Sequence, residues 1–121
     1  MIRRQKKAGD SETGYVLKEE KSMTIQQTRE GQTLTIAIEG RIDTLTAPEL
    51  KTQIEGAIDG VMDLILDFAD VDYISSAGLR SLMTAQNWMD ARDGSMVIRN
   101  ASKNIVGIFK VTGLDSFLVL E

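Results

Sequence analysis

The feature that most constrains the fold of this chain is a short apolar run, Leu64-Ile-Leu-Asp-Phe68. A continuous run with few polar interruptions is typical of a central strand covered on both faces, rather than of a strand at the edge of a sheet. We therefore expect this strand to lie in the middle of a sheet, with helices packed against it.

Strand and helix patterns alternate along the rest of the chain. Two strand patterns, Met23–Thr28 and Leu34–Ile38, are separated by a turn at Arg29-Glu-Gly31 and predict a hairpin. Helix patterns follow over residues 46–60, 76–90 and 104–112, and further short strands are expected over residues 96–98 and 117–120. This order predicts an α/β fold in which a hairpin opens a mixed β-sheet and helices pack against that sheet.

Two of the helices carry specific local signals. The first has a marked start, in which Thr46 is expected to cap the helix, Pro48 lies in the first turn and Glu49 has the capping-box position. In the second helix, one stripe of side chains is expected to face the core: Leu79, Leu82, Met83, Gln86 and Met89.

The residue types that are missing restrict the chemistry. The sequence contains no cysteine and no histidine. Disulfides, thiolate metal sites and a Ser-His-Asp nucleophile are thereby excluded. An enzyme would have to rely on carboxylates such as Asp43, Asp70 and Asp72, whose spacing is equally that of ordinary turn residues. We therefore expect a protein that is not an enzyme and has no metal or cofactor site.

The charges are unevenly distributed. Residues 1–22 contain six Lys/Arg and four Asp/Glu without a sustained apolar period, and we interpret them as a flexible N-terminal extension. Residues 23–121, the expected domain, contain eight Lys/Arg and fourteen Asp/Glu, and such an acidic domain repels a nucleic-acid backbone. No apolar run approaches the roughly 18 residues that cross a bilayer, so we expect a cytoplasmic protein with no membrane insertion.

Two adjacent serines stand where the second helix is expected to begin, after a short polar loop that follows the central strand. A serine at this position can cap the helix by accepting a hydrogen bond from a backbone N–H group. The same helix end also favours a phosphate, because its N–H groups are free and its dipole is positive there. The small residues Ala77 and Gly78 would leave the hydroxyl of Ser76 accessible to a kinase and let a partner's backbone approach. A phosphorylated Ser76 would gain about −1.5 to −2 charges at this point.

Two blocks of sequence carry a family resemblance. The segment Asp70-Val-Asp-Tyr-Ile-Ser-Ser-Ala-Gly-Leu-Arg80 resembles the phosphorylation segment of the STAS domain, the fold shared by anti-sigma factor antagonists. The segment Ile38-Glu-Gly-Arg-Ile-Asp-Thr-Leu-Thr-Ala-Pro-Glu-Leu50 is similar to the strand-loop-helix segment of the same family. The blocks stand in the family's order and spacing, and the similarity covers about residues 23–121.

The resemblance implies a mechanism called partner switching. In the family, the unphosphorylated antagonist binds an anti-sigma factor serine kinase and releases a sigma factor, phosphorylation blocks that binding, and a serine phosphatase restores it. The acceptor position falls on Ser76, with Ser75 as the less favoured alternative. Asp43 aligns with a family Asp near the acceptor, where it would help shape the kinase-binding face, and a turn or cap role is compatible with that. The positions that the resemblance assigns to partner binding are Asp43, Thr44, Thr46, Ser75, Ser76, Ala77, Gly78 and Leu79.

Two other functions are compatible with the same fold. Some domains that this chain resembles are small subunits of lipid-transport complexes, where they bind an ABC-type ATPase. Others are components of a stress-sensing scaffold. The identity of the bound protein separates these alternatives from the anti-sigma factor antagonist.

Overall fold

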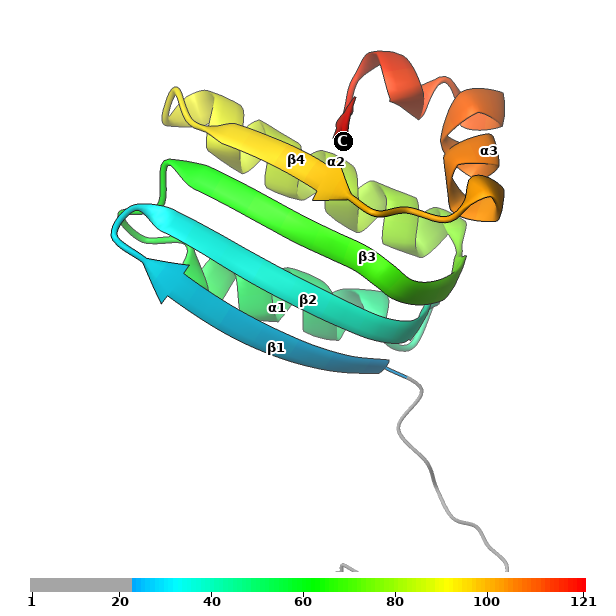
Figure 1. The fold of residues 1–121 in the computed structure, drawn as a ribbon, viewed down its shortest axis with the longest axis horizontal. Coiled ribbons are helices and arrows are strands. Elements are labelled where there is room, and N and C mark those ends of the chain that lie inside the picture. Colours follow the sequence, from blue (N-terminus) through cyan, green and yellow to red (C-terminus); the bar gives the residue numbers. More distant parts are fainter. Residues whose placement is uncertain (1–22) are drawn as a thin grey trace, which may run out of the picture.

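The structure is a computed structural model and describes residues 23–121. The predicted N-terminal extension, residues 1–22, lies outside the described residues. Five strands form a single sheet in the order β1-β2-β3-β4-β5 (Figure 1). Their bounds are Met23–Glu30 (β1), Thr33–Ile42 (β2), Asp63–Ile74 (β3), Ser95–Arg99 (β4) and Val119–Leu120 (β5).

The strand directions confirm the predicted mixed sheet. β1 pairs with β2 in the antiparallel sense along its whole length, from Met23 opposite Gly40 to Glu30 opposite Thr33. Gly31 makes the tight connection possible, because its φ of +62° is costly for residues that carry a Cβ atom. The pairs β2–β3, β3–β4 and β4–β5 are all parallel. The carboxyl ends of β2 and β3 therefore lie at the same edge of the sheet.

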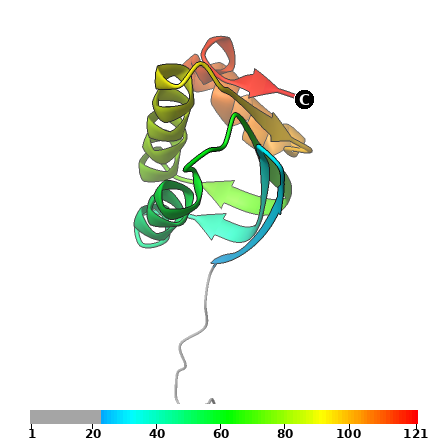
Figure 2. The same cartoon turned by 90° about the vertical axis from the view of Figure 1, so that its left-hand side faces the viewer.

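Three helices and one 3₁₀ turn complete the fold: α1 (Ala47–Ala57), α2 (Ser76–Ala91), α3 (Lys103–Thr112) and η1 (Leu114–Ser116). Helices α1 and α2 lie on the same face of the sheet (Figure 2). Helix α3 lies beside the carboxyl ends of β3 and β4, where its Phe109 ring is 6.4 Å from the ring of Phe68, measured between centroids (Figure 1). Both rings are fully buried, so this pair attaches α3 to the middle of β3.

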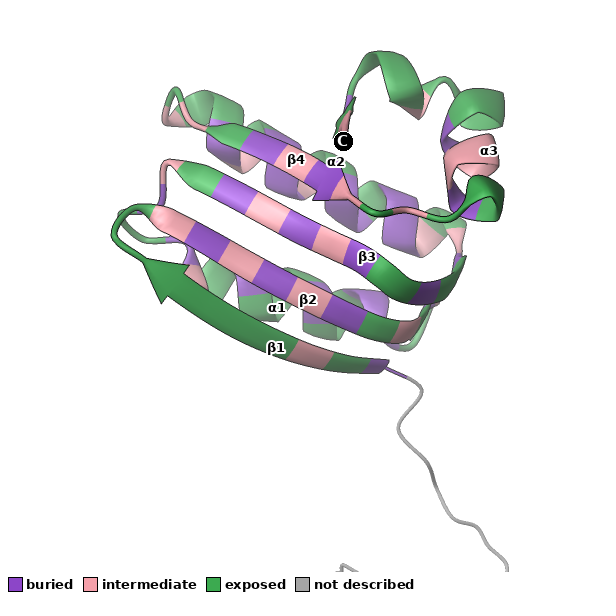
Figure 3. Cartoon of the chain, in the orientation of Figure 1, coloured by how far each residue is buried: buried purple, intermediate pink, exposed green. Residues whose placement is uncertain are grey.

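The sheet is covered on one face rather than on two. Along β3, Leu64, Leu66 and Phe68 are buried, whereas Ile65 and Asp67 are half-buried, and β2 alternates in the same way (Figure 3). The prediction that the central strand is covered on both faces is therefore wrong. Its apolar run is continuous because Ile65 lies between the flanking strands, where the neighbouring side chains shield it without a helix.

The second strand-to-helix segment also differs from its prediction. The residues expected to form a polar loop before α2 continue β3 instead, with Asp70 opposite Glu39, Val71 opposite Gly40 and Ile74 opposite Ile42. Two irregularities in the β2–β3 register interrupt the simple alternation of this part. The polar residues therefore belong to β3, which ends at Ile74, immediately before the helix cap Ser75.

The helix limits follow the predictions closely, with small exceptions. α2 begins at Ser76 as expected, and α1 ends at Ala57, before the predicted stop at Gly60, whose φ of +76° belongs to the following turn. Gly113 ends α3 in the left-handed conformation with φ of +80°, as predicted. The last strand is shorter than expected because η1 occupies residues 114–116 and Phe117 follows it as an exposed residue.

The buried face of α2 is displaced from the predicted stripe, because it includes Gly78, Ser81 and Ala85 and leaves out Met83. Leu79, Leu82, Gln86 and Met89 are buried against the sheet and the neighbouring helix. Met83, which was expected in this stripe, is 38% exposed. Its position one residue after Leu82 turns it away from the line that joins the four buried side chains.

Candidate functional site

The two segments that the sequence singled out meet at the carboxyl edge of β2 and β3. Ile42 is opposite Ile74 in the sheet, and the backbone N–H of Ser75 donates to the carbonyl of Ile42 at 2.8 Å. The loop after β2 and the start of α2 are thus joined directly. The carboxyl ends of parallel strands are also where α/β folds generally carry their functional loops.

The two serines have different roles at the start of α2. Ser75 is the N-cap residue, and its Oγ atom accepts a hydrogen bond from the N–H of Gly78 at 3.2 Å. Ser76 is the first helical residue and is exposed. The Ser76 hydroxyl makes no hydrogen bond to another group within residues 23–121. The capping interpretation therefore applies to Ser75, and Ser76 keeps an accessible hydroxyl.

The electrostatic surroundings of Ser76 suit an anion. The first turn of α2 contains no acidic residue, and the helix has sixteen residues whose peptide dipoles point their positive end toward the serines. A phosphate on Ser76 would lie beside the unpaired N–H groups of this first turn. The helix can therefore carry the added charge without rearrangement of its backbone.

The loop between β2 and α1 is fixed by the side chain of Asp43. Its Oδ1 atom accepts hydrogen bonds from the N–H of Leu45 at 2.9 Å and from the N–H of Thr46 at 3.0 Å. The pKa of Asp43 is lowered, first because the Thr46 N–H stabilises the carboxylate, and also because of Leu45 and Arg41, with partial desolvation acting in the opposite direction. Asp43 therefore acts as a turn residue, and it is not the cap of α1.

Thr46 does not cap α1 with its side chain, contrary to the prediction. Its hydroxyl instead donates to the carbonyl of Arg41 at 2.7 Å and accepts from the N–H of Asp43 at 2.8 Å. The carbonyl belongs to the end of β2 and the N–H to the loop that follows it, so the side chain is held away from the helix N–H groups. Thr46 thereby closes the loop on itself.

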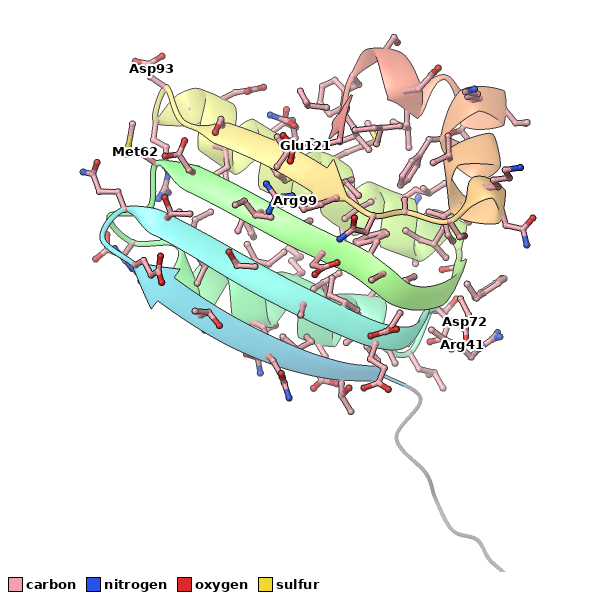
Figure 4. All side chains as sticks on the ribbon, viewed as in Figure 1. Arg41, Met62, Asp72, Asp93, Arg99 and Glu121 are labelled. Carbon is pink, nitrogen blue, oxygen red and sulfur yellow. The ribbon has the colours of Figure 1, made fainter. Side chains whose placement is uncertain are left out.

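Arg41 stabilises the same loop from the sheet. Its guanidinium lies over the ring of Tyr73, 4.1 Å from the centroid, and its Nε atom is 3.7 Å from Oδ2 of Asp43. Arg41 and Tyr73 are opposite each other in the β2–β3 register. Figure 4 labels Arg41 and Asp72 at this end of the sheet. The end of β3 and the loop after β2 are thus linked through side chains as well as through the backbone.

Gly78 is needed for packing inside the protein. A Cβ atom at this position would come within 2.7 Å of Cγ1 of Ile74 and 2.8 Å of Cγ2 of Ile42. It would also lie 3.0 Å from the carbonyl oxygen of Ile42. Because Gly78 is buried, its predicted role of opening the surface to a partner's backbone is replaced by a close approach of α2 to the ends of β2 and β3.

The predicted partner-binding residues divide into an outer and an inner group. Thr44 and Ser76 are exposed, and Asp43, Ser75 and Ala77 are half-buried. Three others, Thr46, Gly78 and Leu79, are buried and can act only by positioning the outer group. Together the outer residues and their supports form one continuous surface at the carboxyl edge of the sheet, which we call the switch surface (residues 41–46 and 73–77).

Sequence reasoning missed one residue of the switch surface. Leu45 is 86% exposed, although it is a large apolar side chain. One sequence signal could have indicated Leu45. It is an apolar residue between Asp43 and Thr46, two residue types common in turns, and it belongs to no strand or helix pattern. Periodicity identifies apolar residues that face a core, and it does not identify one that a loop presents to solvent.

The described residues offer little for other kinds of site. Residues 23–121 contain no group of three or more acidic, histidine or cysteine side chains that could hold a metal ion. In the same range, no helix combines the length and apolar character needed to cross a membrane.

Comparison with known proteins identifies the family. The family model described as "Mlab, STAS domain" matches residues 25–121. The chain belongs to the STAS domain family. Among curated relatives, the anti-sigma-B factor antagonist of Bacillus subtilis (strain 168) is 28% identical over 83 residues, covering 69% of this chain and 76% of that protein.

A second curated relative and a solved structure are also named anti-sigma factor antagonists. The anti-sigma-B factor antagonist of Listeria monocytogenes is 27% identical over 95 residues, which cover 77% of this chain and 82% of that protein. The crystal structure of an anti-sigma factor antagonist from Mycobacterium paratuberculosis is 26% identical with a TM-score of 0.69, covering 82% of this chain and 85% of that one. The STAS fold predicted from the two sequence blocks is thereby confirmed.

Proposed function

We propose that this STAS protein is an anti-sigma factor antagonist that acts by partner switching. In its unphosphorylated form it binds an anti-sigma factor serine kinase through the switch surface, and a sigma factor is released. Phosphorylation of Ser76 blocks this binding, and a serine phosphatase reverses the modification. The names of the curated relatives support the antagonist role.

The observation that carries the proposal is that the two serines have different environments. Ser75 uses its hydroxyl as the helix cap, whereas the hydroxyl of Ser76 is exposed one residue later at the same helix start. A kinase can therefore modify Ser76 without removing the cap that fixes α2.

The effect of phosphorylation would be local and electrostatic. A phosphate adds about −1.5 to −2 charges to a domain whose residues 23–121 already have six more acidic than basic side chains. A partner surface that closes over a neutral hydroxyl would have to accommodate and desolvate this dianion. Loss of docking then follows without any change in the fold of the STAS domain.

Serine-to-alanine variants test the proposed acceptor. With the purified cognate kinase and ATP, Ser75→Ala should accept one phosphate per chain and be destabilised by about 1 kcal/mol, because it loses the cap. Ser76→Ala should accept none and keep its stability within about 0.5 kcal/mol. Intact-protein mass spectrometry and urea unfolding give the two readouts. Wild-type phosphate incorporation into Ser76→Ala would contradict the assignment.

A second function is favoured by the wording of the matching family model, "Mlab, STAS domain", which differs from the anti-sigma naming of the curated relatives. In this alternative the same surface binds an ABC-type ATPase of a lipid-transport complex. Affinity capture from cell extract, followed by identification of the bound protein, separates the two. A kinase with its sigma factor supports the antagonist, and a transporter ATPase supports the alternative.

A further inference from the structure

We propose that Leu45 is the apolar anchor of the switch surface, and that the cognate anti-sigma factor kinase has an apolar pocket that receives it beside the Ser76 site. This inference rests on the proposed function, and it adds a residue that determines affinity for the partner. Ser76 then controls whether docking occurs, and Leu45 supplies much of its strength.

The exposure of Leu45 is the first support. Among residues 23–121, only Leu45 and Val111 are large apolar side chains with more than four-fifths of their surface exposed, at 86% and 88%. Single exposed apolar residues are common on protein surfaces and need no function by themselves. Leu45 differs from Val111 in its position, because it lies on the switch surface and Val111 lies at the far end of α3.

The rigidity of the loop is the second support. The N–H groups of Leu45 and Thr46 both donate to Asp43, and the loop is further held by the bond from the Thr46 hydroxyl to the Arg41 carbonyl and by the ion pair between Arg41 and Asp43. An apolar side chain on a fixed backbone loses little conformational freedom when a partner covers it. Binding hot spots are side chains that the partner desolvates fully in a well-packed pocket, and the fixed loop holds Leu45 ready to enter such a pocket.

The composition of the surrounding surface is the third support. Tyr73 is 39% exposed and its ring lies under the Arg41 guanidinium, so an aromatic and a cationic group adjoin the loop that carries Leu45. Tyrosine and arginine are among the residues most enriched in binding hot spots. The segments on both sides of the loop are bonded to the start of α2. The N–H of Ser75 donates to the carbonyl of Ile42 at the end of β2, and the Ser81 hydroxyl of α2 donates to the carbonyl of Ala47, the first residue of α1, at 3.3 Å. One partner surface can therefore contact Leu45 and Ser76 together.

The experiment measures affinity and phosphorylation for matched variants. Leu45→Ala, Leu45→Met and Val111→Ala are compared with the wild type in binding to the purified kinase, and as substrates of that kinase. Leu45→Ala should weaken binding about 30-fold, and it should raise KM for phosphorylation while leaving kcat within about twofold. Leu45→Met should keep most of the affinity, and Val111→Ala should match the wild type. All four proteins should melt within about 3 °C of one another, because both sites are exposed.

The outcomes separate this inference from the proposed function. If Leu45→Ala binds the kinase as tightly as the wild type, the inference is wrong and the partner-switching proposal stands. If the wild type binds no anti-sigma factor kinase, both are overturned. Analytical ultracentrifugation of the wild type alone is the remaining test. A dimer that Leu45→Ala abolishes would assign the anchor to a second copy of this chain and overturn the inference.

Discussion

The substitution Gly78→Ala tests the packing that presents Ser76. The added Cβ atom would lie 2.7 Å from Cγ1 of Ile74, 2.8 Å from Cγ2 of Ile42 and 3.0 Å from the Ile42 carbonyl oxygen. The side-chain contacts can relax by rotation, but the carbonyl belongs to a paired strand and accepts the hydrogen bond from Ser75. The start of α2 must therefore move away from the sheet.

The magnitude follows from two opposing effects. Overpacking of a dense core typically costs about 1–3 kcal/mol, and the immovable carbonyl favours the upper part of this range. Replacing glycine by alanine inside a helix returns about 1 kcal/mol through its helix propensity. The net loss should be about 2 kcal/mol, which corresponds to a melting temperature about 8–10 °C lower for a domain of this size.

Gly107→Ala is the matched control, because Gly107 is also helical and a Cβ atom there meets nothing within 4 Å. It should gain about 0.5–1 kcal/mol, and urea unfolding of the two variants should therefore differ by roughly 3 kcal/mol. The kinase should also phosphorylate Gly78→Ala more slowly than Gly107→Ala, because the displaced helix start carries Ser76. Equal stabilities of the two variants would refute the close approach of α2 to Ile42 and Ile74.

Two further predictions concern Asp43 and Arg92. The pKa of Asp43 is lowered in the folded state, so the ionised carboxylate stabilises the fold. The wild type should therefore be more stable than Asp43→Asn above about pH 4, and this difference in the free energy of unfolding should disappear as the pH falls through the lowered pKa. Urea unfolding at neutral and acidic pH measures this difference, and an undiminished difference in acid would contradict it. Arg92 donates to the carbonyl of Ile58 at 2.7 Å and of Trp88 at 3.2 Å, which ties together the ends of α1 and α2. Arg92→Ala should lose about 1–2 kcal/mol on urea unfolding, with Arg92→Lys restoring only part, whereas a wild-type stability of Arg92→Ala would show that these bonds contribute nothing.

The sequence predicted the elements whose signals are local. The helix from Ser76 was predictable because two serines and small residues precede an apolar stripe, and the end of α3 was predictable because Gly113 adopts the left-handed conformation there. The hairpin followed from two alternating strands around a glycine turn. In each case the residues that specify the element lie within a few positions of one another.

The sequence could not predict features that depend on a partner segment. The extension of β3 through residues 69–74 is stabilised by pairing with β2 through an irregular register, and its polar residues alone indicate a loop. Thr46 has the spacing of a helix cap, but the carbonyl of Arg41 and the N–H of Asp43 compete for its hydroxyl. The buried state of Gly78 likewise depends on Ile42, which is far away in sequence.

The candidate site divides in the same way. Ser76 was proposed because a serine at a helix start suits a phosphate and matches the acceptor position of the family, and Asp43 was proposed because it aligns with a family Asp. Which of the two serines caps the helix is decided by the hydrogen bond from the Gly78 N–H to Ser75. The exposure of Leu45 is decided by the geometry of the loop. Exposure and hydrogen bonding in three dimensions therefore decide which of the plausible residues are available to a partner.

The most direct measurement for the account is the affinity of the wild-type protein for its kinase before and after stoichiometric phosphorylation at Ser76, determined by calorimetry without ATP. We expect the phosphorylated form to bind at least about 100-fold more weakly, a difference of roughly 2.7 kcal/mol, and phosphatase treatment to restore the original value. Equal affinities of the two forms, with the phosphate mapped to Ser76, would contradict the claim that this hydroxyl controls docking.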